Sequence, residues 1–314
     1  MNAACDAPPL LLGCDFTCAP SRRKPVTLAV GARQGNAVHL HRLLDFATLD
    51  AWQGWLQSQP AWVGAFDLPF GLPRELLQAW RWTGPWEAGM RRYAALERSE
   101  LRERFKAFCA ARPVGAKFAH RATDGPAGSS SSMKWVNPPV AWMMHAAVPR
   151  LLAVDAFFPG LGGRAGSPRV ALEGYPGLLA RDLIGRRSYK SDAMAKQTAD
   201  RRAARDELLR RLEDEGSARL GLRLALDAAQ RERLAADASG DALDAVLCLL
   251  LAAWGEARRS SPGPGYGLPP ESDPLEGWII AAEPARPVFS GAGAGDARPG
   301  AARSSAADPP PRRG

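Results

Sequence analysis

Four aspartates in this 314-residue chain occupy positions where an ionised carboxylate needs a compensating charge. Asp15 interrupts the apolar run LLLGCDFT, and Asp67 lies near the end of the apolar run WVGAFDL. Asp241 and Asp244 are three residues apart in GDALDAVLCLLLAAW, so they share one face of a predicted helix. An unpaired buried charge costs several kcal/mol, and neither Asp15 nor Asp67 has an Arg or Lys adjacent in sequence. A shared cation would compensate all of them, so we predict that the four carboxylates converge on one metal site.

The type of ligand predicts the type of ion. Carboxylate oxygens are the donors that Mg²⁺ and Mn²⁺ prefer, whereas Zn²⁺ sites are built mostly from Cys and His. The four histidines have no zinc-ligand spacing; they are His39, His41, His120 and His145. We therefore expect Mg²⁺ or Mn²⁺ at the predicted site.

Simpler explanations of the same acids stay open. Asp241 and Asp244 would each complement the dipole at a helix N-terminus, which is worth roughly 0.3–1 kcal/mol. This explanation suits Asp241 as well as a ligand role does, whereas Asp244 opens an apolar run and would lie on or near the buried face. All four acids could also pair separately with distant arginines.

The acids end or interrupt segments that are expected to be strands. Residues 10–17 and 62–68 are short apolar runs, which indicates strands covered on both faces of a sheet. A third short strand, RVALE, also ends in an acid, Glu173. Segments 26–32 and 37–43 flank the turn sequence RQGN and predict a hairpin. We expect the acids to meet at one end of the sheet.

Helices are expected to connect and cover these strands. Apolar spacing and capping residues predict helices at 48–58, 91–112, 193–215, 224–237 and 240–257, with a final edge strand at 278–282. A Gly/Ser stretch followed by Pro138-Pro139 indicates an inserted helical and loop region at about 113–168. Strand, hairpin, helix, strand, helix, strand, helix is the order of an RNase H-like α/β fold, a mixed five-stranded sheet with flanking helices, although other α/β folds begin in the same way.

One domain is expected over residues 10–283. Residues 1–9 are small and polar, and residues 284–314 are mostly Ala, Gly, Pro, Ser and Arg, so we predict that both are disordered. The five cysteines form no Cys-x-x-Cys pair, which indicates reduced thiols. The longest apolar run, 245–254, is too short to span a bilayer. A soluble cytoplasmic protein is the expectation.

The formal net charge of +8 suits a protein that meets a polyanion such as a nucleic acid. Residues 181–211 concentrate ten Lys and Arg residues against five acids. The same pattern also suits an ordinary solvated helix face, so nucleic acid is the expected partner without being required by the charge. The sequence leaves protein partners and the oligomeric state open.

Short strings along the chain resemble the motifs of one protein family. They are GCDFT at 13–17, VGAFDLPFGLP at 63–73, LEGYP at 172–176, YKSD at 189–192 and GDALDAV at 240–246. In this order, over about residues 10–283, they resemble family 429 of the domains of unknown function, which is regarded as a group of predicted nucleases with an RNase H-like fold. The segment DALDA is also similar to the closing helix of Holliday-junction resolvases, where two acids three apart join strand-borne acids on the metal.

The resemblance implies a role for each acid. Asp15 corresponds to the first-strand acid, Asp67 to the fourth-strand acid, Asp241 and Asp244 to the last-helix acids, and Glu173 to a further motif acid. It implies metal-dependent hydrolysis of nucleic-acid phosphodiester bonds by a two-metal-ion mechanism. Asp15 would bridge two ions roughly 3.5 to 4 Å apart, and Asp67 and Asp244 would each complete the shell of one ion.

The expected catalytic residues are therefore Asp15, Asp67, Glu173 and Asp244. Candidates for holding substrate phosphates are Arg121, Lys134 and Lys190. Two other classes of function stay open, namely a non-catalytic nucleic-acid or protein binding module on an RNase H-like fold and an actin-like phosphotransferase. Phe16 and Thr17 follow Asp15 where resolvases and actin-like ATPases have a Gly, which disfavours a phosphate-cradling turn and hence the phosphotransferase.

Overall fold

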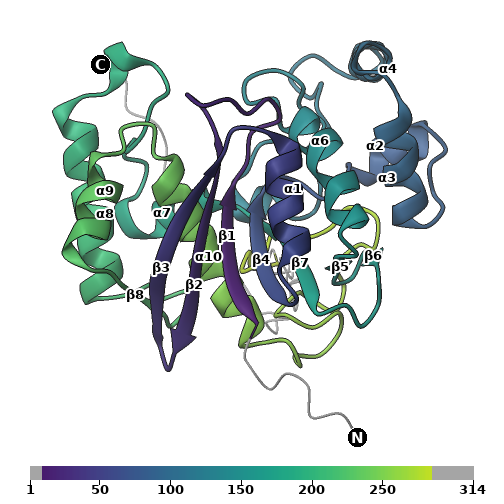
Figure 1. The fold of residues 1–314 in the computed structure, drawn as a ribbon. Coiled ribbons are helices and arrows are strands. Elements are labelled where there is room, and N and C mark those ends of the chain that lie inside the picture. The colour runs from purple at the N-terminus through teal and green to yellow at the C-terminus, as the bar shows by residue number, and fades with distance from the viewer. Residues whose placement is uncertain (1–8, 285–314) are drawn as a thin grey trace, which may run out of the picture. The chain divides into compact units, whose positions relative to one another are not determined.

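The computed structural model describes residues 9–284, which form one mixed sheet with helices packed on both faces (Figure 1). The sequence predicts disorder at residues 1–9 and 284–314. Apart from residues 9 and 284, these segments lie outside the described residues. The sheet has eight strands in the order β6-β5-β7-β4-β1-β2-β3-β8. The fold class is therefore α/β, as the sequence predicts.

Five longer strands form the centre of the sheet. In spatial order they are β3 (Ala37–Phe46), β2 (Val26–Gln34), β1 (Leu10–Asp15), β4 (Trp62–Asp67) and β7 (Arg169–Gly174). β2 is antiparallel to both of its neighbours, whereas β1, β4 and β7 are parallel to one another. The carboxyl ends of β1, β4 and β7 therefore meet at one edge, and each carries an acid at its last residue or next to it.

Three short strands extend the sheet beyond these five. β8 (Arg223–Ala225) pairs with β3, while β5 (Phe157–Phe158) and β6 (Gly162–Gly163) lie beyond β7. The prediction of a five-stranded sheet is wrong in number, because strands of two or three residues are too short to show a periodic pattern. Residues 278–282 make a single parallel bridge to Glu173 instead of the predicted edge strand.

The longer helices within residues 9–284 cover the two faces of the sheet. On one side lie α1 (Leu49–Ser58), α2 (Arg74–Ala79), α3 (Trp86–Ala95), α4 (Arg98–Ala110) and α6 (Val140–Ala153); on the other lie α7 (Pro176–Ile184), α8 (Ala199–Asp214), α9 (Ala228–Ala236) and α10 (Asp241–Glu256). Leu12 and Phe66 belong to the hydrophobic core beneath α1 and α6, whereas Leu11 and Ala65 belong to the core beneath α7 and α10. Because successive residues of β1 and β4 face different cores, both strands are apolar up to the aspartates that end them.

Helix α10 packs directly on β1 and is almost completely buried. A Cβ atom at Gly13 of β1 would collide with the α10 backbone, at the carbonyl of Ala245 and the amide of Leu249. Glycine on the strand and small residues on the helix, among them Ala245 and Cys248, therefore permit the close approach. This contact brings the first turns of α10 to the carboxyl end of β1.

Some predicted helices differ from those in the structure. The segment 91–112 contains two helices, α3 and α4, because the backbone is extended at Leu96 and Glu97. The segment 193–215 consists of a short 3₁₀ turn (Met194–Lys196) followed by α8, and residues 124–127 form the short helix α5 (Asp124–Ala127). Helix α6 lies in the region 113–168, which was predicted as helical and loop without bounds for its helices, whereas α2 and α7 were not predicted. No helix among residues 9–284 combines the length and apolar character needed to cross a membrane.

Candidate metal centre

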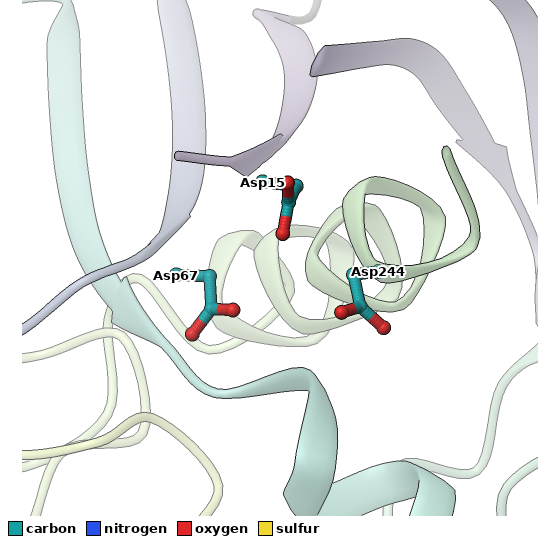
Figure 2. Close-up of side chains that lie close together, drawn as sticks. All are labelled: Asp15, Asp67 and Asp244. Carbon is teal, nitrogen blue, oxygen red and sulfur yellow. The ribbon is translucent and has the colours of Figure 1, made fainter. Parts of the chain in front are cut away.

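Three carboxylates converge at the carboxyl edge of the central strands (Figure 2). Asp15 is the last residue of β1, Asp67 is the last residue of β4, and Asp244 lies in the first turn of α10. One oxygen atom from each lies within 4.8 Å of the others. Asp15 is 8 % exposed and Asp244 is fully buried. The sequence prediction that acids distant along the chain meet at one site therefore holds for these three.

The backbone explains why these three side chains meet. β1 and β4 are adjacent and parallel, with Cys14 opposite Phe66, so the next residues, Asp15 and Asp67, end their strands side by side. Gly13 lets α10 approach β1, as described above, and this positions Asp244 beside them. The geometry is therefore set by strand pairing and by a helix–strand contact, both of which lie outside flexible loops.

The protein environment disfavours the charged forms of Asp15 and Asp67. Burial raises the pKa of Asp15 well above its usual value, and the nearby Asp244 and Asp241 raise it further. Burial also raises the pKa of Asp67 to about 7, although Lys190 opposes this shift. A bound divalent cation would favour the ionised form of each carboxyl. The hard oxygen donors, their closeness and their unfavourable mutual repulsion together mean that this cluster could hold a metal ion.

Lys190 supplies part of the missing positive charge. Its ammonium group contacts Oδ2 of Asp244, and the hydroxyl of Tyr189 donates a hydrogen bond to Oδ1 of the same carboxylate. Burial opposes the charge on Lys190, but Asp244, Asp15 and Asp67 outweigh it and raise the pKa of the ammonium group. One ammonium beside three carboxylates still leaves a surplus of negative charge for a cation to neutralise.

Asp241, the fourth predicted ligand, lies outside this close group of residues. Its carboxylate accepts a hydrogen bond from Nζ of Lys24 at 2.8 Å, and Lys24 also binds Asp192 at 2.5 Å. Burial raises the pKa of Asp241, and Lys24 opposes the shift. The structure thus gives Asp241 a partner from the loop after β1, and its role as a metal ligand stays a prediction.

Glu173 and Arg121, predicted to be catalytic and phosphate-binding, are buried and bound to each other. The guanidinium of Arg121 donates to both oxygens of Glu173, at 2.6 and 2.8 Å, and to Asp124 at 2.9 and 3.1 Å. Glu173 also accepts a hydrogen bond from the backbone amide of Phe70 at 3.0 Å. Burial raises the pKa of Glu173 against the opposing effect of Arg121. Both side chains are therefore part of a buried ion-pair network, and their predicted roles are untested.

The two predicted phosphate-binding lysines have different surroundings. Lys190 contacts the acidic cluster, and it also lines a cavity of about 330 Å³ together with Asp67, Arg121 and Glu173. Lys134 is half-buried, does not line this cavity, and its ammonium group makes no ion pair with residues 9–284. The structure therefore brings one of the two lysines to the candidate centre.

Two residues of the centre were not singled out from the sequence. Tyr189 and Lys24 were missed because each acts on an acid far away along the chain. The string YKSD nevertheless contained the signal: Tyr189 and Lys190 contact Asp244, and Asp192 shares Lys24 with Asp241. Each ionisable or hydroxyl group of this string except Ser191 thus takes part in the centre or its border.

A comparison with known proteins gives the family. The model of the family described as "Protein of unknown function (DUF429)" matches residues 13–266. No curated protein and no solved structure matches the chain. The matched region contains Asp15, Asp67 and Asp244, and with them the whole candidate centre. Since the match covers most of the sequence, the chain belongs to the DUF429 family.

Proposed function

We propose that this protein is a metal-dependent nuclease that hydrolyses phosphodiester bonds of nucleic acid with Mg²⁺ or Mn²⁺ as cofactor. The observation that carries the proposal is the convergence of Asp15, Asp67 and Asp244 from two strands and a helix. Buried carboxylates that share no protein cation of equal charge are costly unless they bind a metal. Phosphodiester hydrolysis is the chemistry that a cluster of acids of this kind supports best.

The arrangement of the central strands supports the finer assignment of an RNase H-like fold. β3, β2, β1, β4 and β7 form a mixed five-stranded unit in which a hairpin precedes two parallel strands, as that fold requires. The short strands β5, β6 and β8 are additions at its two edges.

Each residue of the cluster has a proposed part in the reaction. The three carboxylates form a triangle (Figure 2), in which Asp15 is proposed to contact both of two ions, while Asp67 and Asp244 would each hold one. Two bound ions would lower the pKa of the attacking water and stabilise the leaving oxygen. Tyr189 would orient Asp244 through its hydrogen bond, and Lys190, which lines the adjoining cavity, is proposed to contact a phosphate oxygen.

Basic residues near Lys190 support nucleic acid as the partner. A surface hollow of about 610 Å³ is lined by Arg187, Lys196 and Arg201. Arg187 lies three residues before Lys190 in the sequence. Other arginines of this segment are already paired: Arg202 binds Glu232, and Arg210 binds Glu207. The basic segment is thus partly a solvated helix face, and the proposed contact with the phosphate backbone is limited to its first part.

The test is Mn²⁺-dependent cleavage of DNA and RNA by purified protein. Asp15→Asn and Asp244→Asn should each lower the rate by about 10²-fold or more, the usual cost of removing one electrostatic stabiliser. Asp50→Asn is the matched control, because the Asp50 side chain is 89 % exposed on α1 and lies outside the cluster. Unchanged activity in both cluster variants would refute the proposal.

One observation favours a second candidate, a non-catalytic nucleic-acid-binding module. The contact between Lys190 and Asp244 places a cation of the protein itself beside the carboxylates. On this alternative, calorimetry should detect no Mn²⁺ binding at millimolar concentrations, whereas nucleic-acid binding should persist in Asp15→Asn. The nuclease proposal requires the opposite result for Mn²⁺.

A further inference from the structure

A cavity of about 330 Å³ adjoins the acidic cluster and shares Asp67 and Lys190 with it. This volume is at the lower end of the range for small-molecule sites, about 300–1,000 Å³. It suits one nucleotide unit and is too small for a base pair within a duplex. A molecule bound there would lie next to the candidate metal centre.

The walls of the cavity combine apolar and hydroxyl-bearing side chains. Pro138, together with Val140 and Met143 of α6 and Ile279, provides an apolar surface against which a flat ring could pack. Ser129, Ser130 and Ser132 line another part and provide hydrogen-bonding groups. A nucleobase has an apolar face and a polar edge, and pockets that hold an extruded base use both.

Ser132 is a buried polar side chain without a partner. It is 1 % exposed, and its hydroxyl makes no hydrogen bond within the described part of the chain. The neighbouring Ser131, by contrast, donates to the carbonyl of Ala119 at 2.5 Å. Buried hydroxyls are unfavourable unless they are hydrogen-bonded, so Ser132 is a group that a ligand in the cavity could satisfy.

The charges of the cavity indicate how a nucleotide would be oriented. Arg121 lines it but is held by Glu173 and Asp124, so its charge is compensated. Lys190 is also paired, with Asp244, but its side chain is 40 % exposed, so a ligand in the cavity can reach its charge. A phosphate is expected at Lys190 and Asp67, beside the candidate metal centre, and the base is expected deeper in the cavity.

We propose that this cavity receives one unpaired nucleobase of the substrate, next to the phosphate that is cleaved. The proposal rests on the proposed nuclease function and narrows its substrate class to nucleotides outside a base pair. Such a nucleotide can come from a strand end, from a single strand or from free nucleotide. Base stacking on protein side chains is tolerant of sequence, so weak base preference is expected.

The first test measures binding of adenosine and cytidine 5′-monophosphates by calorimetry with Mg²⁺ present, with ribose 5-phosphate as a ligand that lacks the base. Val140→Trp should fill the cavity and weaken binding of both nucleotides at least about tenfold. Ser132→Ala should weaken it about three- to tenfold, the effect of losing one hydrogen bond. Val136→Trp is the matched control, since Val136 is 51 % exposed and does not line the cavity.

The second test compares Mn²⁺-dependent cleavage of a labelled single strand, a blunt duplex and a duplex with a frayed end. Wild type should cleave the single strand and the frayed end faster than the blunt duplex, and Val140→Trp should remove that preference. Release of mononucleotides would identify strand ends as the source, and internal cleavage would identify single strands. Thermal unfolding checks that each variant is folded. If Val140→Trp does not fold, the same comparison is made with Ser132→Ala.

The outcomes separate this proposal from the nuclease proposal. If nucleotides bind and Val140→Trp weakens their binding, but no nucleic acid is cleaved, the cavity assignment stands and the nuclease proposal fails. If cleavage is abolished by Asp15→Asn but nucleotides bind Val140→Trp as tightly as wild type, the cavity proposal is overturned. Absence of nucleotide binding to wild type, or equal cleavage of blunt duplex and single strand, overturns it as well.

Discussion

Binding of Mn²⁺ at the acidic cluster should release protons and should weaken steeply as the pH falls. The reason is that the metal requires ionised carboxylates, whereas burial in the metal-free protein favours the protonated forms of Asp15 and Asp67. Burial raises the pKa of Asp67 to about 7 and raises that of Asp15 well above its usual value. At neutral pH, part of the cluster must therefore lose protons before it can bind the ion.

The size of the effect follows from the pKa of Asp67. A carboxyl with a pKa of about 7 is half ionised at pH 7 and about 1 % ionised at pH 5. Mn²⁺ affinity should consequently fall about 100-fold between pH 8 and pH 5 from Asp67 alone, which corresponds to about 2.7 kcal/mol. Asp15 adds a further decrease, so about 100-fold is the minimum expected.

Calorimetry at several pH values, in buffers with different enthalpies of ionisation, measures both affinity and proton release. At pH 7 at least about half a proton per protein should be released, because Asp67 is then half protonated. Asp67→Asn is the control, since it removes this contribution and should flatten the pH dependence. An affinity that is constant from pH 5 to pH 8, with no proton release, would show that the carboxyls are not perturbed as described.

Three further predictions concern single residues. Gly13→Ala should destabilise the protein by about 1–3 kcal/mol in thermal or urea unfolding, because the added Cβ collides with α10. Gly54→Ala is the control and should not destabilise the protein, because a Cβ there meets nothing within 4 Å. Lys190→Gln should bind Mn²⁺ about tenfold more tightly by calorimetry, since the ammonium no longer competes for Asp244, and weaker binding would contradict this. Arg121→Met should cost about 3–5 kcal/mol of folding stability at neutral pH, because it leaves Glu173 unpaired and buried; an unchanged unfolding midpoint would favour a purely phosphate-binding role.

Metal-free protein should also lose stability as the pH rises from about 4 to 7. The folded-state pKa of Asp67 lies above its unfolded value, so the folded protein binds more protons than the unfolded chain in this window. The stabilisation from protonated Asp67 is complete below the unfolded pKa and disappears as the pH passes the folded one. Bound Mn²⁺ should reverse the trend, which unfolding curves with and without Mn²⁺ will reveal.

The acidic cluster was predictable from sequence because burial and charge conflict locally. Asp15 and Asp67 lie in apolar runs that require two covered faces, and Asp244 begins an apolar helix, so each position shows an unexplained charge without any knowledge of the fold. The same local logic predicted β1, the β2–β3 hairpin, α1, β4 and α10, whose apolar patterns are long enough to recognise.

Pairings between distant residues could not be predicted in this way. The bonds of Arg121 to Glu173 and of Lys190 to Asp244 join segments that no periodic pattern relates. Strands of two or three residues and the helices α2 and α7 were missed for a related reason, since they become stable through packing on the sheet and not through their own pattern.

The sequence by itself determined which carboxylates lie where their charge must be compensated, because an acid inside an apolar segment is anomalous wherever the segment lies. Only the tertiary structure decided which of them lie together. Parallel pairing of β1 with β4 and the close contact of α10 at Gly13 bring Asp15, Asp67 and Asp244 together. Asp241 instead forms an ion pair with Lys24. The burial of a segment can be predicted from the apolar pattern of its own residues. The distance between side chains of different segments depends on how those segments pair and pack, so it is known only from the tertiary structure.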